Sequence, residues 1–117
     1  MNARFELIKD GTDRVRFRLL GTEGELLLAG LPCRGKIAAQ NEVVHARRSI
    51  TAGDHFVPHT DKNGKHFVVL KDDDGTVLGR SRVVAREDDL SMLIERIVEY
   101  AESANIVDHT QTRGRAG

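Results

Sequence analysis

The fold of this chain follows from one stretch in which charged and apolar side chains alternate, Arg14-Val15-Arg16-Phe17-Arg18-Leu19. Successive side chains of a strand point to opposite faces of a sheet, so this period of two predicts a strand with one buried face. Apolar runs flank it at Phe5–Ile8 and Glu25–Ala29, separated from it by turn residues at Asp10–Asp13 and Thr22–Gly24. We therefore predict a three-stranded antiparallel meander.

The same pattern returns 51 residues further along the chain. A shift of that length aligns the two halves without a gap and pairs identical residues at Phe5/Phe56, Asp10/Asp61, Leu19/Leu70, Gly24/Gly75 and Leu27/Leu78. Strands are predicted at 55–59, 66–70 and 76–81. The Asp-Gly step at 74–75 supports a hairpin, because both residues tolerate positive φ. We interpret the halves as a tandem repeat.

A helix is predicted after each meander. One apolar stripe with helical spacing runs through the first helix and an equivalent stripe through the second, Ala39, Val43, Ala46 and Ile50, then Leu90, Ile94, Ile97 and Ala101. The expected fold class is α+β, a tandem β-β-β-α repeat that forms one antiparallel sheet with two helices on one face. The expected core contains Phe5, Phe17, Leu19, Leu27, Phe56, Leu70, Leu78, Ile94 and Ile97.

We expect a single domain over residues 1–110, built of two repeats at about 4–50 and 55–108, followed by a flexible tail at 111–117. Asn105–Asp108 is predicted to form one further short strand. The tail has no apolar periodicity, so we expect truncation after Asp108 to leave the fold intact.

The composition excludes several classes of protein. Basic and acidic residues number 18 each, and the hydrophobic content of 39% is enough for a core. No apolar run approaches the roughly 18 residues of a membrane-spanning helix. The N-terminus has no apolar signal core, and the single cysteine, Cys33, excludes an internal disulfide. We expect a cytoplasmic location and no membrane partner.

Several stretches resemble the YegP-like family: Phe5–Asp10, Arg16–Leu19, Gly24-Glu25 and Gly35–Asn41. The resemblance covers roughly residues 4–50 and, more loosely, 56–108, and Ala104–Thr110 is similar to the family's usual ending. It implies single or tandem β-β-β-α units joined into one antiparallel sheet with helices on one face. It implies no catalytic motif, and the family has no assigned biochemical role. The second half departs from the family's Arg-aromatic-Arg pattern with Phe67-Val68-Val69.

The first candidate site is a ladder of arginines, Arg14, Arg16 and Arg18. Alternation places their side chains on the sheet face that the helices leave open, where guanidinium groups can bind phosphates. In the alternative, which we favour, Glu6 and Glu25 pair with these arginines across strands on a solvated face. The zero net charge and few stacking aromatics count against a nucleic-acid binder.

The remaining polar clusters predict no chemistry. His55, His59 and His66 lie too far apart in extended strands to share a metal, and Asp72–Gly75 lacks the ligand spacing of a calcium loop. Cys33 and His45 form the one possible thiol–imidazole pair, with nothing to orient the imidazole. We therefore predict no catalytic residues, no metal and no cofactor.

The last candidate is an apolar feature of the second meander. If the 51-residue shift holds, Val68 and Leu70 face the helices and Phe67 and Val69 lie on the open face. A slip of one residue would instead turn Phe67 inward and expose Val68. We predict a non-catalytic protein-interaction or binding module in which Phe67 and Val69 contact a protein partner or a second copy. The alternative is an anion or nucleic-acid binder that uses the Arg14, Arg16 and Arg18 face.

Overall fold

The computed structural model describes residues 2–110, so the predicted flexible tail at 111–117 lies outside the described residues. Its elements follow the order β1 Arg4–Lys9, β2 Arg14–Leu20, β3 Leu26–Gly30, β4 Cys33–Arg34, α1 Lys36–Ala52, β5 Phe56–Thr60, β6 His66–Lys71, β7 Val77–Ser81, α2 Glu87–Ser103 and β8 Asn105–Asp108. The short strand predicted at Asn105–Asp108 is present as β8. No helix within residues 2–110 is long and apolar enough to cross a membrane.

The strands form one mixed sheet. Seven of them lie in the order β5-β6-β7-β3-β2-β1-β8, and β4 pairs with the beginning of β2. The prediction of a purely antiparallel sheet is wrong at one edge, because β8 runs parallel to β1, with Phe5 opposite Ile106. Three antiparallel pairings separate β7 from β1, so β1 runs opposite to β7. After α2, β8 also runs opposite to β7, and at the free edge of β1 it therefore forms a parallel pair. The α+β class is correct.

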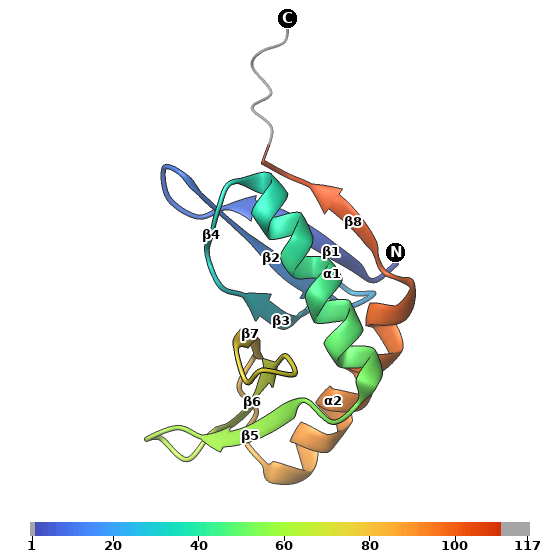
Figure 1. Cartoon of the computed structure of the whole chain (residues 1–117). Helices are drawn as coiled ribbons and strands as arrows, with labels where there is room; N and C mark the ends of the chain where they lie inside the picture. Colours follow the sequence, from blue (N-terminus) through green and yellow to red (C-terminus); the bar gives the residue numbers. More distant parts are fainter. Residues whose placement is uncertain (1, 111–117) are drawn as a thin grey trace, which may run out of the picture.

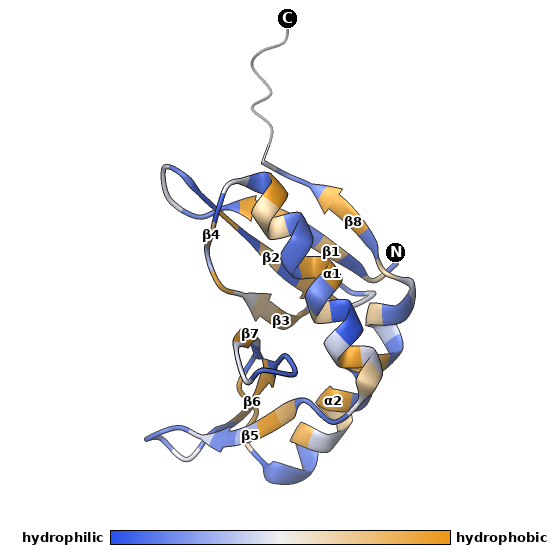
Figure 2. Cartoon of the chain, viewed as in Figure 1, coloured by the Kyte–Doolittle hydropathy of each residue, from blue (hydrophilic) through white to orange (hydrophobic). Residues whose placement is uncertain are grey.

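The core lies between the sheet and the two helices (Figure 1). Both helices bury one stripe of apolar residues in it, and both appear in Figure 2 as alternating hydrophobic and hydrophilic bands. Of the nine predicted core residues, seven are buried, whereas Phe56 and Ile94 pack against the edge of the cluster. Leu93, which was not predicted, is buried at the position expected for Ile94.

Several local features of the two halves lie 51 residues apart. Both helices have 17 residues and begin at Lys36 and Glu87. The β2–β3 register shifts between Leu19 and Leu20, and the β6–β7 register shifts between Leu70 and Lys71. In the first half, this bulge lets two consecutive leucines, Leu27 and Leu28, both face the core with no exposed surface.

The two halves join where β3 pairs with β7. Gly30 is opposite Gly79 in this pairing, and the backbones approach closely. A Cβ atom on Gly79 would lie 2.6 Å from the carbonyl oxygen of Ala29. The joint therefore requires a residue without a side chain at Gly79.

The register of the second meander is the one that the 51-residue shift predicts. Val68 and Leu70 are fully buried beneath the helices, like Phe17 in the first half. Phe67 and Val69 are half-buried on the opposite face of β6. The rival register, which would bury Phe67 and expose Val68, is wrong.

Candidate functional site

The sheet face opposite the helices, here called the open face, carries a continuous row of cross-strand partners. The pairings join Val57 to Val69, Val69 to Arg80, Arg80 to Ala29, Ala29 to Arg18, Arg18 to Glu6 and Glu6 to Val107. Directly opposed residues of neighbouring strands project from the same face and lie close enough to interact. The row therefore crosses the whole sheet, from β5 to β8.

One end of the open face is apolar and built around Phe67. The Phe67 ring stacks on the imidazole of His59, with centroids 5.4 Å apart and an interplanar angle of 14°. The guanidinium carbon of Arg80 lies 4.4 Å from the centroid of the same ring. Val57 and Val69 lie opposite each other beside this stack and are both half-buried. The strands on either side of β6 thus hold Phe67 in place.

The other end is basic, and it contains the three predicted arginines. Arg18 pairs with Glu6, with Nη2 and Oε1 2.8 Å apart, and Arg16 pairs with Asp10 at 3.2 Å. Arg14 is exposed and forms no ion pair with any of residues 2–110. Two of the three arginines are therefore held by carboxylates, as the solvated-face alternative predicted. The prediction that Glu25 also pairs with these arginines is wrong, because Glu25 pairs with Arg96 of α2, at 3.6 Å.

Glu6 is the electrostatic centre of the basic end. Its carboxylate is only 6% exposed and accepts hydrogen bonds from Arg18 and from Arg4, the latter at 2.9 Å, and it lies 3.2 Å from His109 Nε2. Burial alone would raise the pKa of Glu6, but hydrogen bonds from Arg18 and Arg4, together with the charges of Arg4 and His109, lower it overall. The carboxylate therefore remains ionised, and its interactions are with residues of the same chain.

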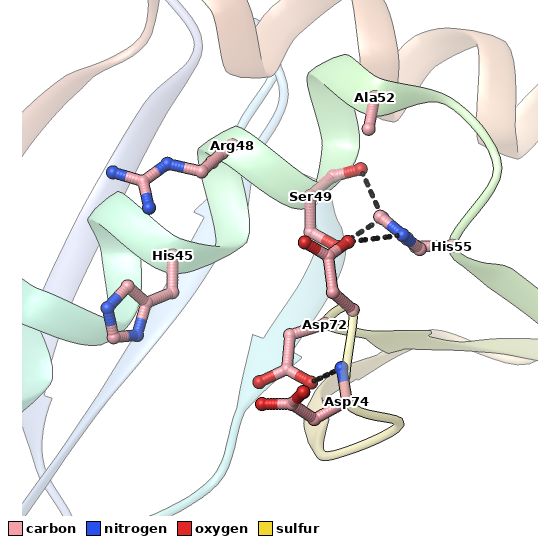
Figure 3. Close-up of a pocket in the computed structure, with 8 residues that line it drawn as sticks. His45, Arg48, Ser49, Ala52, His55, Asp72 and Asp74 are labelled. Carbon is pink, nitrogen blue, oxygen red and sulfur yellow. Dashed lines mark hydrogen bonds and ion pairs between the residues drawn. The ribbon is translucent and has the colours of Figure 1, made fainter.

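A second polar cluster joins α1 to the β6–β7 hairpin (Figure 3). Ser49 Oγ lies 2.9 Å from His55 Nδ1, and His55 Nε2 lies 3.0 Å from Asp73 Oδ1. These side chains border an open cavity of about 370 Å³, which His45 and Arg48 line from α1. A serine, a histidine and an aspartate in sequence are the components of a nucleophilic triad, so their geometry needs a direct test.

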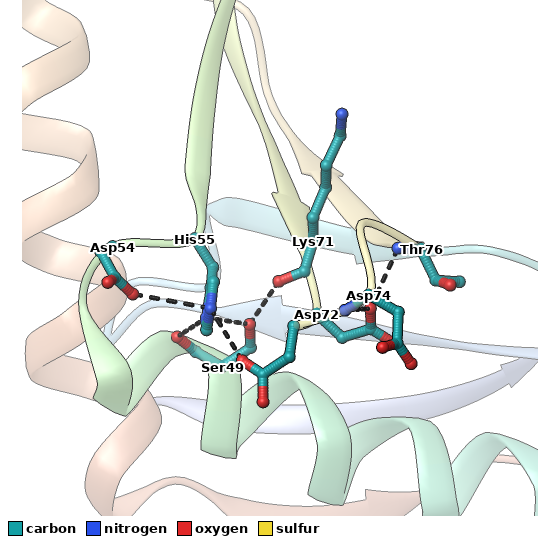
Figure 4. A network of polar contacts seen from close by, with 8 residues as sticks. Ser49, Asp54, His55, Lys71, Asp72, Asp74 and Thr76 are labelled. Atoms are coloured by element: carbon teal, nitrogen blue, oxygen red, sulfur yellow. Dashed lines mark hydrogen bonds and ion pairs between the residues drawn. The ribbon is translucent and has the colours of Figure 1, made fainter.

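The geometry shows contacts that join α1 to the β6–β7 hairpin and do not activate the serine. Ser49 is 4% exposed, and its hydroxyl donates to the backbone oxygen of Lys71 (Figure 4). With that single hydrogen used, His55 Nδ1 must donate to Ser49 Oγ and cannot take its proton as a general base does. The side chain of Asp73 is 91% exposed. Ser49 is therefore not an activated nucleophile. The contacts join three segments with no motif spacing, which is why sequence reasoning missed them.

The other predicted polar residues are placed as follows. Asp72 accepts hydrogen bonds from the backbone nitrogens of Asp74 and Thr76, at 2.8 and 3.0 Å, which confirms the hairpin interpretation (Figure 4). Burial, with the nearby charge of Glu42, raises the pKa of the Cys33 thiol. Cys33 is therefore a packed thiol at neutral pH. Within residues 2–110, no group of three or more His, Cys, Asp or Glu side chains is placed to hold a metal ion.

Comparison with known proteins gives relatives over nearly the whole chain, although no family model matches it. UPF0339 protein PA0329 of Pseudomonas aeruginosa is 24% identical over 110 residues, which is 94% of this chain and 100% of that protein. These matching residues support a YegP-like, UPF0339 family assignment. The assignment confirms the resemblance that the motifs indicate.

Two solution NMR structures share the fold. Protein yegP of E. coli, of unknown function, superposes with a TM-score of 0.87 at 24% identity, covering 96% of this chain and 97% of that one. UPF0339 protein SO3888 of Shewanella oneidensis superposes with a TM-score of 0.86 at 23% identity, covering 100% and 99%. The YegP-like fold is therefore established for the chain, and these matches indicate no enzymatic family.

Proposed function

We propose that this YegP-like chain is a non-catalytic interaction module that binds an acidic protein partner on its open face. The observation that supports the proposal most strongly is the position of Phe67. It is a large aromatic side chain on the solvated face of β6, next to the edge strand β5, and it contacts His59 on one neighbouring strand and Arg80 on the other. Aromatic and arginine side chains are the residue types most enriched at the centres of protein interfaces.

The open face is preorganised for binding. Association costs the conformational entropy of every side chain that it immobilises, so side chains already held in place lose less. Phe67 and Arg80 hold each other, and Glu6 holds Arg18 at 2.8 Å. With Val57 and Val69 alongside, an apolar contact area lies next to fixed cations. Such a surface fits a partner that offers apolar side chains beside carboxylates.

The charges favour a different protein over a second copy of this chain. The carboxylates of Glu6 and Asp10 are already paired with Arg18 and Arg16. A second copy would bring the same arginines to the contact, together with carboxylates that are already in ion pairs. Arg80 would then have no unpaired carboxylate to contact. A partner with its own acidic residues supplies what this face lacks. A homodimer is therefore the outcome that the experiment below must distinguish.

The proposal includes the origin and location of the module. We infer that the halves are a tandem repeat, supported by the equivalent helices and bulges 51 residues apart. Joining β3 to β7 edge to edge places the apolar face of one repeat beside the basic face of the other. We also propose a cytoplasmic location, which rests on the single cysteine, Cys33.

The alternative is nucleic-acid or anion binding by Arg14, Arg16 and Arg18. Two observations weigh against an extended nucleic-acid surface. Arg16 and Arg18 are paired with carboxylates. The Phe67 ring also stacks on His59 and lies against the Arg80 guanidinium, and a stacking base would have to compete with these contacts.

The test is partner capture from the native host with the apolar side chains of the open face replaced by charged ones. In the Phe67→Lys/Val69→Lys variant, we expect loss of a captured acidic protein and an unchanged monomeric sedimentation profile. Met92→Lys/Val98→Lys is the matched control, because these side chains are 59% and 40% exposed on α2. It should capture as wild type does. A wild-type dimer that the Phe67/Val69 variant dissociates would replace the acidic partner by a second copy. Undiminished capture and unchanged sedimentation would remove the open face as the interface.

A further inference from the structure

A separate basic site lies at the start of β2, away from Phe67. Arg14 of β2 stands directly opposite Arg34 of β4 in an antiparallel pairing. Both side chains are exposed, and neither forms a hydrogen bond or an ion pair with any of residues 2–110. Like charges in directly opposed positions of two strands repel and destabilise the pairing.

The contrast along β2 makes this pair unusual. Each of the next two arginines on this face has a carboxylate, Asp10 for Arg16 and Glu6 for Arg18. Arg14 has a second arginine where its neighbours have acids. The chain therefore leaves two cations side by side, and no carboxylate among residues 2–110 forms an ion pair with either of them.

Both arginines border one open cavity of about 370 Å³, to which Lys9 adds a third cation and Thr12 a hydroxyl. Asp13 also borders the cavity and is the one carboxylate among its lining residues. Guanidinium groups bind tetrahedral oxyanions through paired hydrogen bonds, and an ammonium adds a point charge. The three cations outnumber Asp13, so the cavity favours an anion with more than one negative charge.

We propose that Lys9, Arg14 and Arg34 form a binding site for a phosphate group, either as the free ion or as a monoester. The bound group bridges Arg14 and Arg34 and removes their repulsion. The site is independent of partner binding at Phe67, because it uses a different end of the sheet. Of the three arginines in the predicted ladder, this site includes only Arg14, and Lys9 and Arg34 take the places of Arg16 and Arg18.

The experiment is an NMR titration of the ¹⁵N-labelled chain at constant ionic strength with inorganic phosphate, phenyl phosphate or chloride. We expect saturable shifts confined to the amides of residues 9–15 and 33–36 with phosphate or phenyl phosphate, and none with chloride. A preference for one of the two identifies the free ion or the monoester. Arg14→Gln and Arg34→Gln should each weaken binding at least tenfold. Arg82→Gln, an exposed arginine of the second half, is the matched control and should bind as wild type does.

A stability measurement keeps the test independent of folding defects. In phosphate-free buffer, Arg14→Gln should melt at or above the wild-type temperature, because it removes the repulsion from Arg34. Phosphate should raise the melting temperature of wild type and leave that of Arg14→Gln unchanged. Shifts that follow ionic strength with every anion, or equal binding by both Gln variants, would overturn the proposal. Tighter binding of a single-stranded oligonucleotide, with shifts spread over the open face, would also overturn it in favour of a nucleic-acid surface.

Discussion

Phe17 fills the space above Gly30 so closely that a Cβ atom at Gly30 would lie 2.3 Å from Cε2 of the Phe17 ring. The corresponding pair in the second half is Val68 and Ser81, 51 residues further along. There the smaller Val68 leaves room for a side chain, and Ser81 Oγ accepts a hydrogen bond of 3.0 Å from the Val68 backbone nitrogen. In each half, the larger residue of the pair packs against a smaller one, Phe17 against Gly30 and Val68 against Ser81.

This matching predicts that substitutions at the two positions are coupled. Gly30→Ser alone should lower the free energy of unfolding by about 1–3 kcal/mol, because it overpacks the core. Phe17→Val alone should lower it by less than the roughly 3–5 kcal/mol typical of Phe→Ala. The double variant copies Val68 and Ser81 and should lose at least about 1 kcal/mol less than the sum of the single losses. Urea unfolding of all four proteins measures this, and strictly additive losses would contradict it.

The buried carboxylate of Glu6 predicts a loss of stability in acid. Its pKa in the folded chain lies below the usual 4.5, so ionisation of Glu6 stabilises the fold. That contribution is complete above the unfolded-state pKa and disappears as the pH falls through the lower folded-state pKa. At neutral pH, Glu6→Gln should cost about 1.5–3 kcal/mol, the range for hydrogen bonds to charged groups.

The pH profile supplies the control for Glu6. The difference in unfolding free energy between wild type and Glu6→Gln should shrink as the pH falls from about 6 toward 3. Hydrogen bonds from Thr110 and the ion pair with Lys36 also lower the pKa of Asp108, so the variant should keep some acid sensitivity. A wild-type–variant difference that stays constant over this range would show that Glu6 acts through packing alone.

The contacts of the fold continue past Asp108, after which the sequence predicted that truncation would leave the fold intact. The His109 backbone nitrogen donates to the Leu7 oxygen at 2.9 Å, and the His109 side chain lies 3.2 Å from Glu6. Truncation after Asp108 should therefore lower the free energy of unfolding by about 1–2 kcal/mol. Truncation after Thr110 is the matched control and should leave it unchanged. Equal unfolding free energies of the two truncated chains would contradict this prediction and support the expectation that residues after Asp108 do not stabilise the fold.

Periodicity predicted the strands, the helices and the core because each of these depends on local alternation. The burial of Val68 beneath the helices and the position of Phe67 on the open face both follow from the 51-residue shift. The direction of β8 could not be predicted in the same way. A four-residue strand contains no signal that distinguishes parallel from antiparallel pairing, and only the path of α2 determines it.

The candidate site was predictable as a face and not as a set of partners. Alternation placed Arg14, Arg16 and Arg18 on one side of β2. It could not place Arg34 opposite Arg14, because β4 has two residues and no periodicity. The stacking of Arg80 on Phe67 depends on the register of the β6–β7 hairpin, in which Val69 is opposite Arg80, and the strand bounds predicted from periodicity do not determine that register.

The most direct test of the open face as the interface is site-specific photo-crosslinking in the native host. p-Benzoylphenylalanine replaces Phe67 in one chain and Met92, which is 59% exposed on α2, in the control. We predict a discrete crosslinked product with an acidic protein from position 67 and none from position 92. Crosslinking at position 92 but not at position 67, or the same products from both, would contradict the account.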